Sequence, residues 1–370
     1  MINYLKILVK RYFVNYLPLH LFSVFCLTVF QVSAQNDTIK AKEKKPETQK
    51  QDISLFGSDE ILNVSLYLDL AGFLKKNSKT DSFEADMIIN PGQADSINRK
   101  VRIKYRGILR YDLCSFPPIQ INFKKSLNSD SGKIKKLKLV THCEPGSLTD
   151  DYVVKEYLVY KLFNALTDTS LRARLVKINY IDSKRNKKTV TKYGVFIEPI
   201  EFLAKRTNST ILKTTTLKQN HIIPNVIDRL AIFNYLVSNW DWSVAGLHNV
   251  EVIKPMSYTP GSLGIAVPYD FDLTGIVNAE YAIPPPNIPI QNIRERLYSG
   301  LCRSKEVYIK DLQEFITRKE NLYSAVNECP YLTQRSKKDI TYFMDEFFDK
   351  LEKPKSMDNL IDDFLRTCKY

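Results

Sequence analysis

Residues 83–105, FEADMIINPGQADSINRKVRIKY, decide the fold class of this chain. Apolar and polar residues alternate on both sides of the central NPGQ, and this period of two is typical of strands with one buried face. Pro91 and Gly92 favour a turn between the two runs. The stretch therefore predicts an antiparallel β-hairpin.

The same alternation extends in both directions and predicts a β-rich first half. Further strand patterns occupy residues 62–70, 118–123, 136–140, 174–181 and 191–200. A helical period interrupts them at residues 150–166, where the apolar residues fall on one face and two aspartates occupy the first turn.

The second half is predicted to be mainly helical. Residues 224–240 form an amphipathic pattern that begins with proline, and residues 248–254 and 261–271 have the pattern of a β-hairpin. Helical patterns return at residues 311–328, 334–352 and 357–368. This layout predicts an α+β protein with an atypical protein-kinase-like two-lobed fold. Its β-rich N-lobe with one helix would span residues 58–205, and a mainly helical C-lobe containing the hairpin would span residues 206–370.

The first residues have the features of a secretory signal. Lys6, Lys10 and Arg11 precede an apolar run without acidic residues, and Val-Ser-Ala at 32–34 supplies the small residues that signal peptidase requires. We expect residues 1–34 to be a cleaved signal peptide and the polar residues 35–57 to be a flexible linker. The protein would then be exported to the periplasm, the cell surface or the medium, with no stable membrane span after processing. A retained N-terminal anchor is the competing interpretation.

Export would place the cysteines after the signal peptide in an oxidising compartment, where disulfides form. None of them is spaced as CxxC, so a zinc site is not expected. We expect Cys114 to pair with Cys143, and Cys368 to pair with either Cys302 or Cys329. One thiol would remain free.

The chain is basic, with a formal net charge of +13, which becomes about +10 (13 − 3) without the three cations of the signal peptide. The basic residues are spread over many segments and do not form an aromatic-interleaved motif, so nucleic acid is not an expected partner. Solvated surfaces and an anionic ligand, such as a nucleotide or a surface polysaccharide, are both compatible with this charge. Neither GxGxxG nor GxxxxGK[ST] occurs, which argues against a glycine-rich phosphate loop.

Three polar residues around the second-half hairpin indicate a site. Asp241 follows the long helix, Asn249 precedes the first strand of the hairpin, and Asp270 follows the second. Because the outer ends of a hairpin lie side by side, Asn249 and Asp270 should be neighbours, with Asp241 held near both. Phosphoryl transfer requires one carboxylate that orients a hydroxyl, and amide and carboxylate oxygens that hold Mg²⁺. Taken singly, Asp241 could simply cap a turn, and Asp270 could be a turn former.

The segments NWDWSVAGLHN (239–249) and VPYDFDLTG (267–275) together resemble the paired motifs of the spore-coat protein H (CotH) family of secreted, atypical kinase-like proteins. YRGILRYDLCSFPPIQINFKK (105–125) resembles an Arg-Gly segment of that family, and residues 150–166 match its lobe helix in position. The resemblance spans residues 62 to 300.

The resemblance implies a role for each matching residue. Asp241 would be the catalytic aspartate, Asn249 and Asp270 would be metal ligands, and Asp272 would support the metal. Glu156 would form the ion pair that steadies a nucleotide-binding lysine. The candidates for that lysine are Lys104, Lys124 and Lys138.

The implied function is transfer of phosphoryl from ATP, with Mg or Mn, to an exported protein or a surface glycan. Two other interpretations stay open. The chain could be a non-catalytic (pseudokinase) envelope protein that serves binding or assembly. It could also be a hydrolase that uses Asp270 and Asp272 with a metal.

Overall fold

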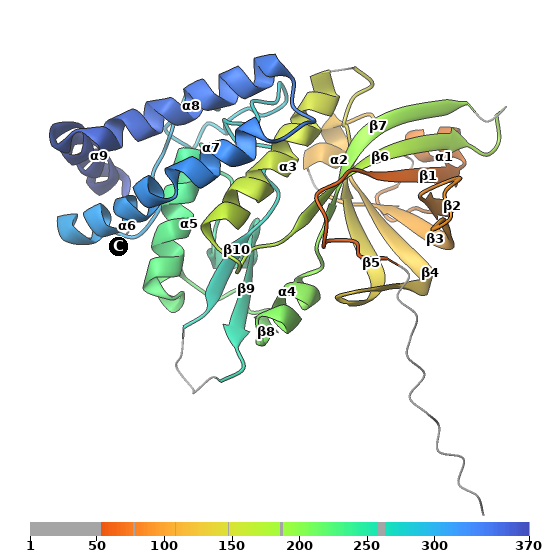
Figure 1. Cartoon of the computed structure of the whole chain (residues 1–370), viewed down its shortest axis with the longest axis horizontal. Coiled ribbons are helices and arrows are strands. Elements are labelled where there is room, and N and C mark those ends of the chain that lie inside the picture. The colour runs from red at the N-terminus through yellow and green to blue at the C-terminus, as the bar shows by residue number, and fades with distance from the viewer. Residues whose placement is uncertain are drawn as a thin grey trace, which may run out of the picture. The chain divides into compact units, whose positions relative to one another are not determined.

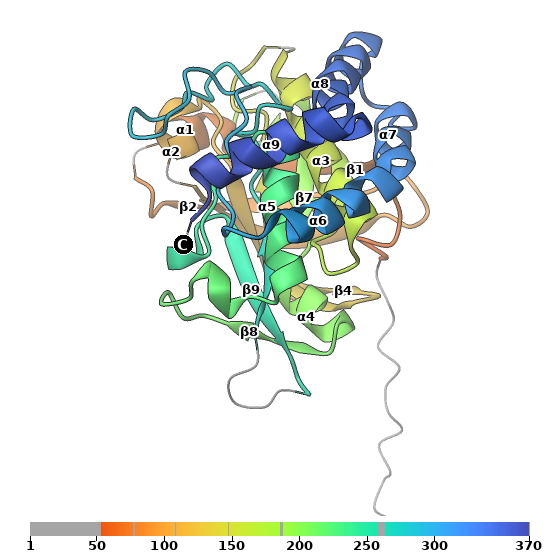
Figure 2. The same ribbon diagram turned by 90° about the vertical axis from the view of Figure 1, so that its left-hand side faces the viewer.

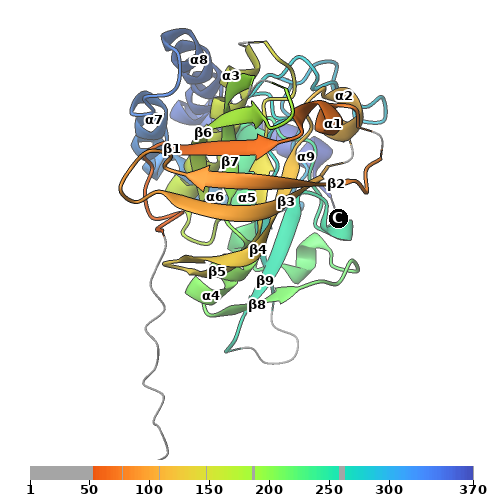
Figure 3. The same ribbon diagram turned by 90° about the vertical axis from the view of Figure 1, so that its right-hand side faces the viewer.

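Seven strands of the first half close into one β-barrel. The computed structural model describes residues 53–76, 78–107, 109–146, 148–185, 188–257 and 263–369. The order around the barrel is β1-β2-β3-β4-β5-β7-β6, and Figure 3 shows its first four strands from the side. The strands are β1 (Leu62–Leu68), β2 (Ser82–Ile89), β3 (Ile97–Tyr105), β4 (Ile119–Ser129), β5 (Gly132–Val140), β6 (Ala173–Asp182) and β7 (Thr189–Ile197).

The predicted hairpin at residues 83–105 is confirmed as β2 and β3, which pair in antiparallel register from Ser82↔Lys104 to Ile89↔Ile97. Asn90 and Gly92 in the turn both have positive φ, 50° and 79°, a conformation that these two residue types adopt more readily than others.

The expected atypical protein-kinase-like two-lobed fold is wrong. The chain does combine strands with helices, but the strands from β1 to β7 form a closed mixed barrel, and helices occupy the C-terminal part. The barrel closes where β1 pairs in parallel with β6, from Leu62↔Val176 to Leu68↔Asp182. Alternation identifies a strand because one face is buried, but it does not encode which distant strand becomes the partner.

A second, three-stranded sheet has the order β10-β9-β8, with β8 (Ser209–Leu212), β9 (Val250–Pro255) and β10 (Ile265–Pro268). The second predicted hairpin is therefore confirmed as β9 and β10, which pair in antiparallel register from Val250↔Pro268 to Ile253↔Ile265. Strand β8 was not predicted.

Helices accompany the barrel and build a second core. They are α1 (Leu70–Leu74), α2 (Leu109–Leu113), α3 (Leu148–Leu166), α4 (Ile200–Arg206), α5 (Pro224–Leu236), α6 (Lys305–Thr317), α7 (Lys319–Asn327), α8 (Gln334–Glu352) and α9 (Pro354–Thr367), with short 3₁₀ turns η1 (Gln219–His221) and η2 (Ala245–Leu247). In Figure 1 α3 lies between the barrel strands and the helices α5 to α9, and Figure 2 shows α6 and α9 in front of α5. The predicted boundary between residues 205 and 206 falls at the end of α4.

Apolar side chains form two buried clusters. One fills the barrel, and it includes Leu55 and Phe56 at the end of the segment predicted to be a linker. The other joins α3 to α5, the hairpin and the C-terminal helices. The predicted signal peptide and most of the predicted linker lie outside the described residues. Within the described ranges, no helix has the length and apolar character needed to cross a membrane.

Two disulfides agree with the predicted pairing. Cys114 is bonded to Cys143 and so fastens the end of α2 to the segment after β5. Cys302 is bonded to Cys368, which resolves the open choice, while Cys329 is buried with a free thiol. Two such bonds are compatible with an exported protein.

Candidate functional site

The loop after α5 holds the Asp241 carboxylate between two side chains. Asn249 Nδ2 donates hydrogen bonds to the Asp241 backbone oxygen (2.8 Å) and to Oδ2 (2.9 Å). His248 Nε2 lies 2.6 Å from Asp241 Oδ1. The Asp241 side chain remains 21% exposed, so it is oriented by its neighbours and still accessible from solvent.

Asn249 and Asp270 lie at adjacent ends of β9 and β10, as predicted. The Tyr269 N–H donates to the Asn249 backbone oxygen at 3.0 Å, and the Asp270 N–H donates to the Tyr160 hydroxyl at 2.9 Å. Both residues have positive φ, 51° for Asn249 and 65° for Asp270. Asparagine and aspartate adopt this conformation more readily than most other residues, so it suits the turns at the ends of the two strands.

Asn249 and Asp270 carry oxygen atoms of the kind that Mg²⁺ prefers as ligands. Asn249 turns its Nδ2 toward Asp241, and none of the hydrogen bonds among the described residues uses its Oδ1. That oxygen and the Asp270 carboxylate are two hard oxygen groups that could hold such a cation, and Mg²⁺ is commonly bound through one or two carboxylates together with water and phosphate. The described residues contain no group of three or more histidine, cysteine, aspartate or glutamate side chains that could hold a metal by themselves.

Asp272 does not join the exposed residues of the site. It is 5% exposed and takes part in a buried cluster in which one cation faces two carboxylates. Arg110 Nε lies 3.6 Å from Asp272 Oδ2, and Arg110 Nη1 lies 3.6 Å from Glu156 Oε2. Arg110 Nη2 donates to the Thr141 backbone oxygen at 2.6 Å. The glutamate on α3 is thus paired with an arginine of α2.

Burial dominates the titration of this cluster. It raises the pKa of Asp272 to about 6, although the Arg110 charge opposes the rise. Burial likewise holds the pKa of Glu156 well above its usual range, and the negative charge of Asp272 adds to the effect. Two carboxylates that share one cation in a medium of low polarity compete for it, so a proton is retained more readily than in water.

The lysine candidates lie on one face of the sheet, outside the barrel. Lys138 Nζ is 4.4 Å from the centre of the Tyr269 ring and 3.9 Å from Glu251 Oε1. Burial, followed by the positive charge of Arg106, lowers the pKa of Lys138, while Asp270 acts in the opposite direction. Lys104 and Lys124 are exposed on β3 and β4. Of the three, Lys138 is the one beside the Asp270 end of the hairpin.

Arg106 is a further cation of this region. Its Nη1 is buried and, in the part of the chain that the structure describes, makes no hydrogen bond. Its charge affects the pKa of both Lys138 and Glu156. An unsatisfied buried guanidinium N–H beside a lysine is a suitable place for an anion such as phosphate.

A cavity of about 340 Å³ opens beside Lys138. Apolar and polar side chains both line it: Leu137, Leu171, Ile197, Pro199, Ile200, Ile211, Leu212 and Leu247, with Gln120, Lys136, Lys138, Glu198, Glu201, Lys213 and Glu251. A mostly apolar hollow with a few convergent polar groups is the usual form of a small-molecule site.

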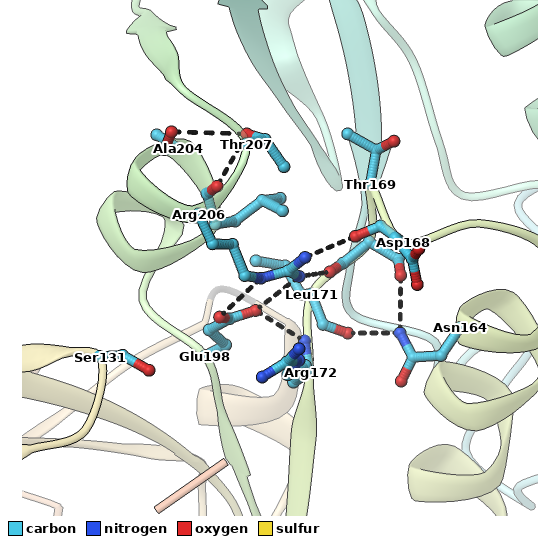
Figure 4. A network of polar contacts seen from close by, with 12 residues as sticks. Ser131, Asn164, Asp168, Thr169, Leu171, Arg172, Glu198, Ala204, Arg206 and Thr207 are labelled. Carbon is cyan, nitrogen blue, oxygen red and sulfur yellow. Dashed lines mark hydrogen bonds and ion pairs between the residues drawn. The ribbon is translucent and has the colours of Figure 1, made fainter. Parts of the chain in front are cut away.

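A network of polar contacts fixes the wall of this cavity at Glu198 (Figure 4). The buried Glu198 carboxylate accepts from Arg206 Nε at 3.2 Å and from Nη2 at 3.1 Å, and its Oε2 also accepts from the Arg172 N–H. Arg206 Nη1 reaches the Asp168 backbone oxygen at 2.6 Å. Helix α4 is therefore tied to the loop between α3 and β6, which keeps the segment after β7 in position.

Sequence reasoning missed Arg110, Arg106 and Tyr160. Arg106 and Arg110 lie within the segment that was matched to the family, but their charges pointed to no particular partner. Nothing in the alternating or helical patterns marks a buried arginine, because one charged residue in a short helix resembles a solvated one.

Compared with known proteins, the chain matches no family model and no curated protein sequence.

Proposed function

We propose that the chain transfers the γ-phosphoryl group of ATP, with Mg or Mn, to a hydroxyl of an exported protein or surface glycan. One observation carries this proposal: Asn249 bonds Asp241 through its side chain, and its backbone oxygen accepts from the N–H of Tyr269, the residue before Asp270. This arrangement supports a site in which one carboxylate would serve the acceptor and two oxygens would hold a cation. The resemblance of these segments to the spore-coat protein H family points in the same direction.

Asp241 would orient the acceptor hydroxyl and take its proton. Its Oδ1 and Oδ2 each have one hydrogen-bonded neighbour, His248 and Asn249, and an ionised carboxylate oxygen can accept a second bond. These two contacts fix the carboxylate in one orientation. Phosphoryl transfer depends mainly on such positioning of the reacting groups, together with electrostatic stabilisation.

Asn249 Oδ1 and the Asp270 carboxylate would hold the cation, which when bound neutralises charge on the phosphate oxygens. Lys138 and Arg106 would contact the phosphates, since the charges of Asp270 and Arg106 both act on Lys138 and the Arg106 Nη1 lacks a hydrogen bond among the described residues. The cavity beside Lys138 would take the nucleoside.

The test is transfer of labelled phosphate by the protein with Mg²⁺ or Mn²⁺, using casein, a glycan mixture and the protein itself as acceptors. Asp241→Asn and Asp270→Asn should each abolish transfer while the thermal midpoint stays close to that of the wild type. Asp358→Asn, the same change at a half-exposed aspartate on α9, should leave transfer intact. Transfer at wild-type rates in both site variants would remove the assigned roles.

A second candidate is a non-catalytic envelope protein, and one observation favours it. Glu156, which the resemblance assigns to a nucleotide-binding lysine, is paired with Arg110. A thermal melt separates the two candidates. Nucleotide and metal at about 100 times the dissociation constant should stabilise a nucleotide-binding protein by about 2.7 kcal/mol, whereas a non-binding protein shows no shift.

A further inference from the structure

The outer surface of β3, β4 and β5 carries a group of cations around a hollow whose lining includes no acidic residue. A hollow of about 580 Å³ lies there, lined by Arg102, Lys104, Gln120, Asn122, Phe123, Lys124 and Lys136. We call Arg102, Lys104, Lys124 and Lys136 the cationic face. The hollow meets the cavity beside Lys138, because Gln120 and Lys136 line both.

Strand register arranges these side chains in two rows. Lys104 on β3 pairs with Gln120 on β4, and Gln120 pairs with Lys138 on β5. Two residues along, Arg102 pairs with Asn122, and Asn122 pairs with Lys136. Each row therefore has a cation at both ends and an amide in the middle. Rows lie about 6.6–6.8 Å apart along the strands, and the cations of a row are about 9.5 Å apart at their Cα atoms.

Only part of this positive charge is neutralised within the protein. Glu84 on β2 pairs with Arg102 at 3.0 Å and also pairs with Lys124. Lys104 and Lys136 are exposed, and neither has an ion pair among the described residues. Lysines held on rigid strands, with no counter-charge, attract an anionic partner.

The amides in the middle of the two rows have few hydrogen-bond donors left for a ligand. Gln120 Nε2 donates to Asn122 Oδ1 at 2.7 Å, and Asn122 Nδ2 donates to the Arg102 backbone oxygen at 3.1 Å. Both amide NH₂ groups thus already donate within the sheet, and the ammonium groups at the sides remain as the binding groups.

We propose that the cationic face binds an extended, acidic segment of a partner protein, lying over β4 between the cations of β3 and β5. In an extended peptide, alternate side chains lie on one face about 6.6–6.8 Å apart, which equals the spacing of the rows. Carboxylates at every second position would meet Lys104 on one side and Lys136 on the other.

Other anionic partners fit this surface less well. Glu84 and Asp86 on β2 border the cations, and Asp86 forms its own pair with Lys100 at 2.7 Å, so a flat anionic membrane would press against acidic groups. Phe123, the aromatic residue of the lining, is 8% exposed and offers no ring face for the stacking that binds single-stranded nucleic acid. A narrow, extended peptide that lies between the cations of β3 and those of β5 avoids both difficulties.

This binding surface does not depend on the proposed phosphoryl transfer, and its test needs no activity. A labelled peptide of alternating glutamate and serine is titrated with the protein at low ionic strength, and its fluorescence anisotropy is followed. Lys104→Glu/Lys136→Glu should weaken binding by roughly ten- to thirty-fold, because each change removes one attraction and adds one repulsion. Rising salt should weaken the wild-type complex.

The control is Lys177→Glu/Lys188→Glu, which makes the same change in net charge at two exposed lysines of β6 and the loop that follows it. Unchanged binding in this variant supports the cationic face. Equal weakening in both double variants would show that net charge alone attracts the peptide and would overturn the proposal. Absence of wild-type binding, or tighter binding of a sulfated oligosaccharide than of the peptide, would overturn it as well.

Discussion

Replacing Arg110 with methionine should destabilise the protein strongly at neutral pH and much less in acid. The substitution keeps the length of the buried chain and removes the cation that lies 3.6 Å from Glu156 and 3.6 Å from Asp272. At pH 8, above the pKa of about 6 for Asp272, this carboxylate would then stay buried without a counter-charge. Removing one partner of a buried ion pair costs about 3–5 kcal/mol, and we expect a loss of this size at pH 8.

The loss should shrink as the pH falls, because protonated carboxyl groups no longer need the cation. Each proton that the variant takes up in its native state lowers the penalty by up to about 1.4 kcal/mol per pH unit. At pH 5 what remains is mainly the lost hydrogen bond to the Thr141 backbone oxygen, about 1.5–3 kcal/mol for a charged donor.

Guanidinium chloride unfolding of wild type and variant, without metal and at pH 8, 6.5 and 5, measures these differences. Arg294→Met, which removes a partly exposed pair with Asp339, should cost at most about 1 kcal/mol at every pH. Adding Glu156→Gln and Asp272→Asn to Arg110→Met should recover much of the loss at pH 8. A loss at Arg110 that is the same at all three pH values would refute the reasoning, since it would mean that the carboxylates do not depend on this cation.

Two further predictions concern single features of the fold. Asp272→Asn should flatten the dependence of stability on pH, because burial raises the pKa of Asp272 from 3.8 to about 6. This carboxyl group stabilises the native state fully below about pH 4 and loses that contribution as the pH rises through about 6. Unfolding measured from pH 4 to 7 would show the difference between variant and wild type. Replacing both cysteines of a disulfide with serine should lower the free energy of unfolding more for Cys302–Cys368 than for Cys114–Cys143. Loop-closure entropy gives losses of about 4.3 and about 3.6 kcal/mol for loops of 66 and 29 residues. Unfolding curves in the opposite order would contradict this reasoning.

The sequence pattern predicted those parts of the candidate site that depend on residues close together in the chain. Asn249 and Asp270 precede and follow two short strands with a turn between them, and an antiparallel pair must bring such positions together. Asp241 is only eight residues before Asn249, so a tight loop was enough to join them. These contacts depend on strand period and turn length, both of which can be read from the sequence.

Contacts between distant segments could not be predicted from strand period and turn length. The closure of the barrel rests on Val64 of β1 facing Ile178 of β6, and either strand would fit many partners of the same apolar character. The partner of Glu156 was expected to be a lysine and is Arg110. That arginine lies on a five-residue helix whose position comes from tertiary contacts.

The disulfide next to that helix connects the fold to the site. Cys114 follows α2 directly and is bonded to Cys143, so α2 cannot leave the end of β5, and Arg110 stays beside Thr141. Arg110 in turn faces Asp272, two residues beyond Asp270. Because a five-residue helix has little stability of its own, the covalent bond substitutes for the packing that a longer helix would provide. Reduction should therefore loosen the Arg110 contacts before the barrel unfolds, and hydrogen exchange in α2 should rise under reducing conditions while exchange in β1 and β6 stays slow. Equal acceleration in α2 and the barrel strands would show that the disulfide stabilises the whole fold and has no particular link to the site.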